Sequence, residues 1–260
     1  MNKIHAIALI VFLINPLNIL AELSGYPGEI YALKVENQEI SSNLIIKIDG
    51  DSYKLIPLPF NKQGKTIKVN DRDILIKEKD FGESRITITN TSMVNLSSEE
   101  SQRAIRESKI IKKAINTYSR DMKSDFNFIK PVKGIISSQY GKRRYINDSP
   151  RSPHLALDIA AVSGTDIVAP EKGRVILIGN FFYAGKYMII DHGHGLLTSY
   201  SHLSMINVNE NQFIEKGQKV GEVGSTGRVT GPHLHWTVYL NKIRINPESI
   251  IQDNFLQSIL

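Results

Sequence analysis

Residues 224–236 read GSTGRVTGPHLHW, and in this stretch His233 and His235 alternate with the apolar residues Leu234 and Trp236. Side chains on a β-strand point to opposite faces in turn. A strand here therefore places both histidines on one face, and Leu234 and Trp236 on the other, where they can enter a core. The segment predicts a strand that offers two imidazoles to one surface.

A second segment, HLALD at residues 154–158, has the same arrangement. As a strand it would place His154 and Asp158 on one face, and Leu155 and Leu157 on the opposite, core-facing side. His202, within YSHL at residues 200–203, is a third candidate. Two strands are thus expected to present metal-ligand side chains on one side and apolar packing on the other.

These side chains are typical ligands and acid–base groups of a zinc site. Zinc binds imidazole and carboxylate in tetrahedral geometry, and a catalytic site keeps one position open. Three of the candidates suffice as ligands, and two histidines remain for proton transfer. Spacing alone does not decide which are which. The helical motif H-E-x-x-H is absent, and with no cysteine in the chain thiolate ligands and a cysteine nucleophile are excluded.

The surrounding chain predicts a mainly β protein with one linking helix. Residues 127–250 are dense in glycine and in short apolar segments, which favours many tight turns and an antiparallel β domain. Residues 22–92 predict a small β-sandwich-like domain. Its expected strands are Ile30–Val35, Leu44–Ile48, Tyr53–Leu58, Thr66–Val69, Ile74–Lys77 and Arg85–Thr89. Residues 251–260 are expected to form a tail.

Residues 93–126 are expected to be the linker. Ser97 and Glu100 have the spacing of a capping box. Apolar residues then recur at helical spacing up to Tyr118, and lysines gather late in the run. The pattern predicts a helix over about residues 98–120.

Residues 1–21 have the pattern of a secretory signal peptide. Lys3 precedes an apolar run over residues 6–14, and Ala21 is a small residue at a cleavage point. The run is shorter than the roughly 20 residues that cross a bilayer, so cleavage is favoured over a membrane anchor. The formal charge of +6 favours an anionic partner, but the basic residues are scattered and no nucleic-acid motif is present.

Residues 128–248 resemble the lysostaphin/LytM-type zinc endopeptidases, which are peptidoglycan hydrolases. The resemblance rests on the stretches already quoted and on further motifs that follow in the family's order. These are YGKR at 140–143, APEKG at 169–173, DHG at 191–193 and YSHLS at 200–204. It implies a small open β-structure with a groove across one sheet. Residue by residue, it implies His154, Asp158 and His235 as zinc ligands, and His202 and His233 as catalytic histidines beside a zinc-activated water.

Two positions depart from the family pattern. Ala156 stands where glycine is common, and we expect it to crowd the site face slightly. Thr237 stands where an acidic residue is common, and we expect it to alter the groove. His192 and His194 lie in a glycine-rich turn and are interpreted as structural. Asn147 and Arg151 precede His154 in a loop and are equally compatible with substrate contact and with exposure to solvent.

The resemblance implies a secreted enzyme, periplasmic in a Gram-negative bacterium, that cuts peptide cross-links of peptidoglycan. The cross-link is left open between D-alanine–diaminopimelate and a glycine bridge. A non-catalytic activator of other wall hydrolases is the alternative, but it predicts lost ligands, and all five are present. A biotinyl- or lipoyl-type carrier is disfavoured because the lysine motif is missing. The N-terminal domain is a hypothetical cover for the groove.

Overall fold

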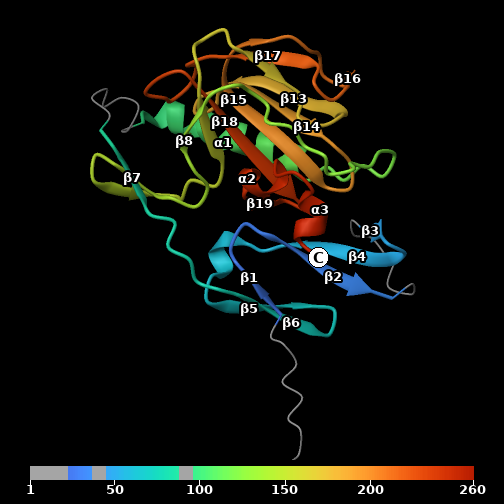
Figure 1. Cartoon of the computed structure of the whole chain (residues 1–260). Helices are drawn as coiled ribbons and strands as arrows, with labels where there is room; N and C mark the ends of the chain where they lie inside the picture. Colours follow the sequence, from blue (N-terminus) through green and yellow to red (C-terminus); the bar gives the residue numbers. More distant parts are fainter. Residues whose placement is uncertain (1–22, 37–44, 88–95) are drawn as a thin grey trace, which may run out of the picture.

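The computed structural model describes residues 23–36, 45–87 and 96–260 (Figure 1), so the predicted signal peptide lies outside the described residues. The fold is mainly β, as the sequence predicts. No helix in the described part of the chain is both long and apolar enough to cross a membrane.

A ten-stranded antiparallel sheet forms the C-terminal part. Its order is β16-β13-β14-β15-β18-β11-β8, and β17 pairs with β15 and β12, while β19 pairs with β18. The strands are β8 Ile135–Ser138, β11 Leu157–Ala160, β12 Asp166–Val168, β13 Gly173–Phe181, β14 Gly185–Asp191, β15 Leu196–Ile206, β16 Phe213–Ile214, β17 Lys219–Val223, β18 His233–Leu240 and β19 Ile243–Ile245. Two short helices follow, α2 Pro247–Ile250 and α3 Phe255–Ser258.

The side chains of strand β18 alternate between the two faces of this sheet. Leu234 and Trp236 are fully buried in the main hydrophobic core, as the alternation predicts. His233, His235 and Tyr239 point to the opposite side, which we call the histidine face. The period of two therefore sets which surface of the sheet carries chemistry and which carries packing.

The N-terminal part consists of two small sheets with a core of their own. One has the order β1-β6-β5 and the other β2-β4-β3. The strands are β1 Ser24–Gly25, β2 Ile30–Val35, β3 Ile45–Ile48, β4 Asp51–Pro57, β5 Lys65–Val69 and β6 Arg72–Ile76, with a 3-10 turn, η2, at Phe60–Lys62. Leu33, Ile56, Leu58 and Ile74 are buried between them. The expected sandwich is therefore present, but the strand expected at Arg85–Thr89 does not join it. Residues Glu83–Ile86 instead pair with Arg143–Ile146 of the C-terminal part, and residues 88–89 lie outside the described residues.

The N-terminal sheets pack against the C-terminal part and share its main hydrophobic core. Ile30 and Leu55 are buried in the same cluster as Phe126 and Phe255. Residues 251–260, expected to be a tail, include α3, whose Phe255 stacks on Phe126. A third small sheet, β10-β9-β7, joins β7 Glu83–Ile86 to the hairpin β9 Arg143–Ile146 and β10 Ser149–Arg151.

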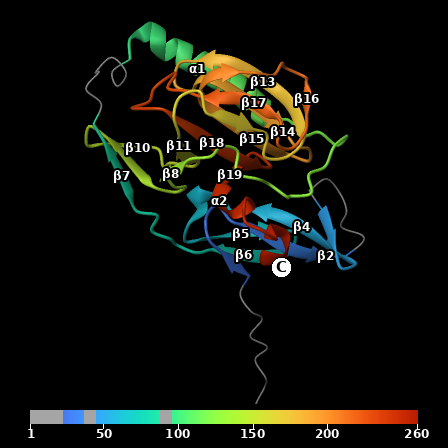
Figure 2. The ribbon, with the colours of Figure 1, turned by 45° about the horizontal axis from the view of Figure 1, so that its top comes forward.

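Helix α1, Ser98–Ile115, lies along β13, as Figure 2 shows. The predicted capping box is present: Ser97 Oγ accepts the Glu100 N–H at 3.1 Å, and Glu100 Oε2 accepts the Ser97 N–H at 2.9 Å. The helix ends five residues before the predicted limit of about 120. Its last turn tightens, because the Thr117 N–H bonds to the Ala114 carbonyl, three residues back.

Helix α1 packs on the apolar end of the histidine face. Ile111, Ala114 and Ile115 contact a cluster that includes Tyr187 and Tyr239. Hydrogen bonds add to this contact: the Arg103 guanidinium donates to the Asn180 carbonyl at 3.3 Å, and the Phe182 N–H donates to the Glu107 carboxylate at 2.6 Å. Ile105, one of the apolar residues of the helix, is 58% exposed and does not take part in this packing.

Candidate active site

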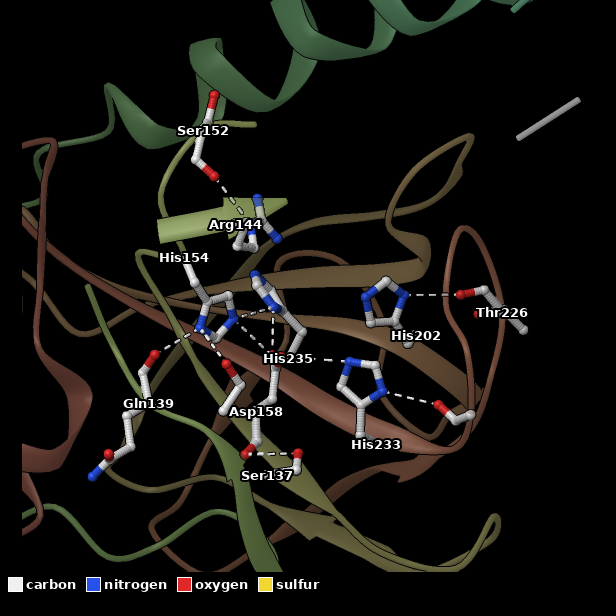
Figure 3. A network of polar contacts seen from close by, with 12 residues as sticks. Ser137, Gln139, Arg144, Ser152, His154, Asp158, His202, Thr226, His233 and His235 are labelled. Carbon is white, nitrogen blue, oxygen red and sulfur yellow. Dashed lines mark hydrogen bonds and ion pairs between the residues drawn. The ribbon is translucent and has the colours of Figure 1, made fainter. Parts of the chain in front are cut away.

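Five of the predicted site residues gather at one end of the histidine face (Figure 3). His235 on β18 pairs in register with Asp158 on β11, and His233 pairs with Ala160, so two strands bring these side chains together. The carboxylate oxygen Oδ1 of Asp158 lies 2.7 Å from His235 Nδ1 and 3.0 Å from His154 Nε2. His154 Nε2 and His235 Nδ1 are 3.3 Å apart.

His154 reaches this group from a loop, which corrects the predicted strand. Strand β11 begins only at Leu157, and the backbone of His154 instead bonds to Lys142 and Gly141 in the preceding hairpin. Without strand alternation, Leu155 is not in the core. It lines the cavity beside His235. Ala156, expected on the site face, is 1% exposed and packs inside.

His202 and His233 lie next to the first three residues. The ring centroids of His202 and His233 are 4.9 Å apart, and His233 Nε2 is 3.9 Å from Asp158 Oδ1. Each ring has Nδ1 at 2.9 Å from a backbone carbonyl oxygen, that of Thr226 for His202 and that of Gly231 for His233. A carbonyl only accepts, so Nδ1 donates and Nε2 keeps its lone pair.

A backbone irregularity orients His202. Its φ is +67°, which is uncommon for a residue other than glycine, and the register of β15 against β14 and β17 shifts around it. Such bulges re-aim side chains and are frequent beside active sites. The sequence carried no signal for this feature, because nothing local to YSHL marks a positive φ.

The electrostatics of the group favour a cation. Burial raises the pKa of the Asp158 carboxyl, but His235 and His154 more than offset it and hold that pKa well below its usual range. Burial and the neighbouring imidazoles of His235 and His233 lower the pKa of His202 to about 3. Burial also lowers the pKa of His235. The charged forms of the His202 and His235 imidazoles are therefore disfavoured beside the one carboxylate.

The donor set fits a zinc ion. His154, Asp158 and His235 each offer one ligand atom, and these atoms lie within 4.8 Å of one another. Tetrahedral bonds of about 2.0–2.1 Å place two ligand atoms about 3.3 Å apart, which matches the His154–His235 spacing. His154 Nδ1 donates to the Gln139 carbonyl at 2.9 Å, a contact that directs Nε2 toward the metal position.

The other predicted residues lie outside this group. His192 is buried, with Nδ1 at 2.7 Å from the Lys172 carbonyl and Nε2 at 2.8 Å from Thr198 Oγ1. His194 packs on Tyr118. Asn147 and Arg151 are not among the residues that line the cavity beside His235.

Thr237 is 4% exposed and lines the cavity beside His235. Arg144, which the sequence did not single out, lines the same cavity. No described residue of the N-terminal sheets does so, although Ile111 of α1 does, which leaves the expected cover by the N-terminal domain without support.

Residues 152–247 match the model of peptidase family M23. The chain carries an M23 peptidase domain. A Pseudomonas aeruginosa crystal structure assigned to peptidase M23 aligns with a TM-score of 0.67 and 27% identity, and the match covers 87% of this chain and 94% of that one. The M23 match includes all five gathered residues.

Two Vibrio cholerae proteins are among the similar sequences. Peptidoglycan DD-endopeptidase ShyA is 40% identical over 112 residues, which is 43% of this chain and 26% of that protein. Peptidoglycan DD-endopeptidase ShyB is 29% identical over 185 residues, which is 67% of this chain and 42% of that protein. The chain thus spans less than half the length of these relatives.

Proposed function

We propose that this chain is a secreted zinc metalloendopeptidase that hydrolyses peptide cross-links of peptidoglycan. The observation that carries the proposal is the convergence of His154, Asp158 and His235 on one point, with His202 and His233 beside them. The M23 match over residues 152–247 and the names of the two Vibrio relatives support the reaction and the substrate class.

In this proposal His154, Asp158 and His235 hold the metal. The carboxylate of Asp158 compensates part of the charge of a dication, and the two imidazoles supply nitrogen ligands. A bound zinc ion supplies Lewis acidity toward water and a peptide carbonyl. The Gln139 carbonyl fixes the tautomer of His154, so that its Nε2 is ready to bind without rearrangement.

His202 and His233 are the proposed catalytic histidines. In both rings Nδ1 donates to a carbonyl oxygen, so the lone pair that can accept a proton lies on Nε2. A neutral imidazole can accept a proton from the attacking water and return it to the leaving amine. The imidazolium formed in between stabilises negative charge that develops on the attacked carbonyl oxygen.

The test separates metal binding from turnover. The purified chain, loaded with zinc, is incubated with sacculi, and the soluble peptides are identified by mass. We expect release that a chelator abolishes and that zinc restores. His154→Ala and His235→Ala should lose zinc, whereas His233→Ala should retain it and lose turnover. His194→Asn, which changes a histidine outside the site, is the matched control.

Other outcomes would contradict the ligand assignment or the enzymatic function. Full zinc occupancy in the His235 variant would contradict the ligand assignment. Chelator-insensitive release, or no release by a zinc-loaded and folded chain, would contradict the enzyme. The non-catalytic activator instead predicts that soluble peptides appear only when a second wall hydrolase is added. Secretion is tested by the mass of the chain recovered from the periplasmic fraction, which should lack about the first 21 residues.

A further inference from the structure

The carbonyl loop, which we define as residues 224–233, holds Nδ1 of both proposed catalytic histidines. Each ring has Nδ1 at 2.9 Å from a backbone carbonyl oxygen of this loop, and Thr226 supplies the one at His202 (Figure 3). An isolated bridge closes the loop, because the His233 N–H donates to the Gly224 carbonyl at 3.2 Å. The position of Thr226 in this loop therefore decides where His202 finds its acceptor.

The side chain of Thr226 ties the carbonyl loop to the bulge that carries His202. Thr226 Oγ1 accepts the Lys186 N–H at 2.9 Å and donates to the Leu203 carbonyl at 2.8 Å. Lys186 and Leu203 are partners across strands β14 and β15, next to the point where the register between these strands shifts. The hydroxyl therefore joins both strands of the bulge, through the donor and the acceptor that a threonine side chain offers.

Thr226 thus contacts the bulge twice. Its hydroxyl fixes the residue on β14 and β15, and its carbonyl accepts from the ring that the bulge presents. A β-branched side chain has few χ1 rotamers, so the hydroxyl and the carbonyl keep a nearly constant spacing. The place of the carbonyl is therefore set relative to the same backbone that sets the direction of His202.

The tautomer of His202 depends on this acceptor. A carbonyl oxygen only accepts, so Nδ1 carries the proton and the lone pair lies on Nε2. If the Thr226 carbonyl moved away, the Nδ1 proton would lose its partner and both tautomers would be populated. In the second tautomer Nε2 carries a hydrogen and cannot accept a proton from water.

We propose that Thr226 is a positioning residue for the hydrolysis: its hydroxyl holds the carbonyl that keeps His202 in the Nδ1–H form. Thr226 acts through His202 and has no ligand role toward the metal. The inference rests on the proposed peptidase function, in which His202 is a catalytic histidine.

Two substitutions at position 226 separate the hydroxyl from the shape of the side chain. Thr226→Val keeps the shape and removes the hydroxyl, whereas Thr226→Ser keeps the hydroxyl. With zinc-loaded protein and a soluble cross-linked muropeptide, we expect kcat to fall by roughly 10- to 100-fold in Thr226→Val with KM little changed, since a displacement of about 1 Å costs up to about 100-fold. Thr226→Ser should recover most of the wild-type kcat.

Thr165→Val is the matched control. Thr165 Oγ1 donates to the Val162 carbonyl at 2.7 Å in the turn before β12, so this variant loses the same kind of bond outside the site and should keep the wild-type kcat. The Arg228 N–H, which donates to the Tyr183 carbonyl at 3.0 Å, keeps the carbonyl loop attached in Thr226→Val. Zinc content and thermal melting verify that each variant is folded and loaded.

The tautomer gives a second readout that needs no turnover. In the metal-free chain at about pH 8, above the ordinary histidine pKa of about 6.5, the 15N shifts of the ring show which nitrogen carries the proton. The spectrum of His202→Ala identifies the signals of His202 by their absence. Wild type and Thr226→Ser should show the proton on Nδ1 alone, whereas Thr226→Val should show averaged shifts.

The outcomes separate the inference from the function that it rests on. An unchanged kcat in Thr226→Val, even with a lower melting temperature, would make the hydroxyl merely structural and leave the peptidase intact. An equal loss of kcat in Thr226→Ser, or a proton on Nδ1 alone in Thr226→Val, would also overturn the positioning role. No chelator-sensitive cleavage by a folded, zinc-loaded wild-type chain would overturn both.

Discussion

Glu171 is a buried acid whose titration should be visible in the stability of the protein. The residue is 2% exposed. Its Oε1 accepts the Lys172 N–H at 2.8 Å, while Oε2 has no donor among the described residues. Burial and the adjacent Asp125 raise the pKa of Glu171 to about 7. A proton on Glu171 gives the pair a hydrogen bond that two carboxylates cannot form.

The raised pKa of Glu171 fixes the sign and the size of its contribution to the pH dependence of the free energy of unfolding. Between the ordinary value of 4.5 and about 7, the folded state keeps the proton and the unfolded state has lost it. The contribution of Glu171 to the free energy of unfolding is therefore complete below pH 4.5 and is lost as the pH rises to 7. At about 1.36 kcal/mol per pH unit, the interval amounts to about 3 kcal/mol.

Glu171→Gln tests this without changing the size of the side chain. The amide is neutral at every pH, so the free energy of unfolding of the variant, relative to wild type, should grow by about 3 kcal/mol between pH 4.5 and 8. The measurement is chemical denaturation at fixed pH values, with chelator present for both proteins. Glu215→Gln, which makes the same substitution at an exposed position, is the matched control.

His192 contributes a pH dependence of the free energy of unfolding with the opposite sign to that of Glu171, over nearly the same pH range. The variant is therefore compared with wild type at each pH. Burial lowers the pKa of His192 to about 4, so its contribution to stability is lost as the pH falls from 6.5 to 4. The two slopes partly cancel in the wild-type profile. A difference between Glu171→Gln and wild type that stays constant from pH 4.5 to 8 would refute the reasoning, whatever the shape of either curve alone.

Two further substitutions test the fold around the site. Ser97→Ala removes the N-cap of helix α1 and should lower the free energy of unfolding by about 1 kcal/mol, which denaturation measures; an unchanged value would mean that the cap contributes nothing. Gly185→Ala should reduce turnover at least about tenfold while zinc is retained. Its φ is +62°, and an added Cβ would overlap the backbone of Thr226, whose carbonyl orients a proposed catalytic histidine. Gly164→Ala, with φ of +90° and open space around it, has the same kind of strain and should keep its turnover.

Strand β18 shows how much of the site could be predicted from the sequence. The alternation of His233, Leu234, His235 and Trp236 predicts the two faces, and the structure has Leu234 and Trp236 in the core. The prediction succeeds because β18 is a regular strand between two partners, β11 and β15, so that side-chain direction follows from position alone.

The same rule fails where long-range contacts set the backbone. His154 lies before its strand, where pairing with Lys142 and Gly141 decides its direction. The direction of His202 depends on a positive φ and a register shift in β15. Arg144 enters the cavity from a hairpin that pairs with β7, a strand about 60 residues earlier. None of these contacts leaves a periodic signal in the sequence.

The histidine face has two ends with different requirements. At one end Tyr187 and Tyr239 belong to an apolar cluster that would be costly to leave in water, and helix α1 covers it with Ile111 and Ile115. At the other end, the imidazoles of the proposed active site must stay accessible to a polar substrate. Ile111 stands at the boundary, because it contacts the apolar cluster and also lines the cavity beside His235. Helix α1 therefore bounds the cavity beside His235 and also covers the apolar cluster, so a fragment that begins after the helix would expose the tyrosines and open the cavity wall.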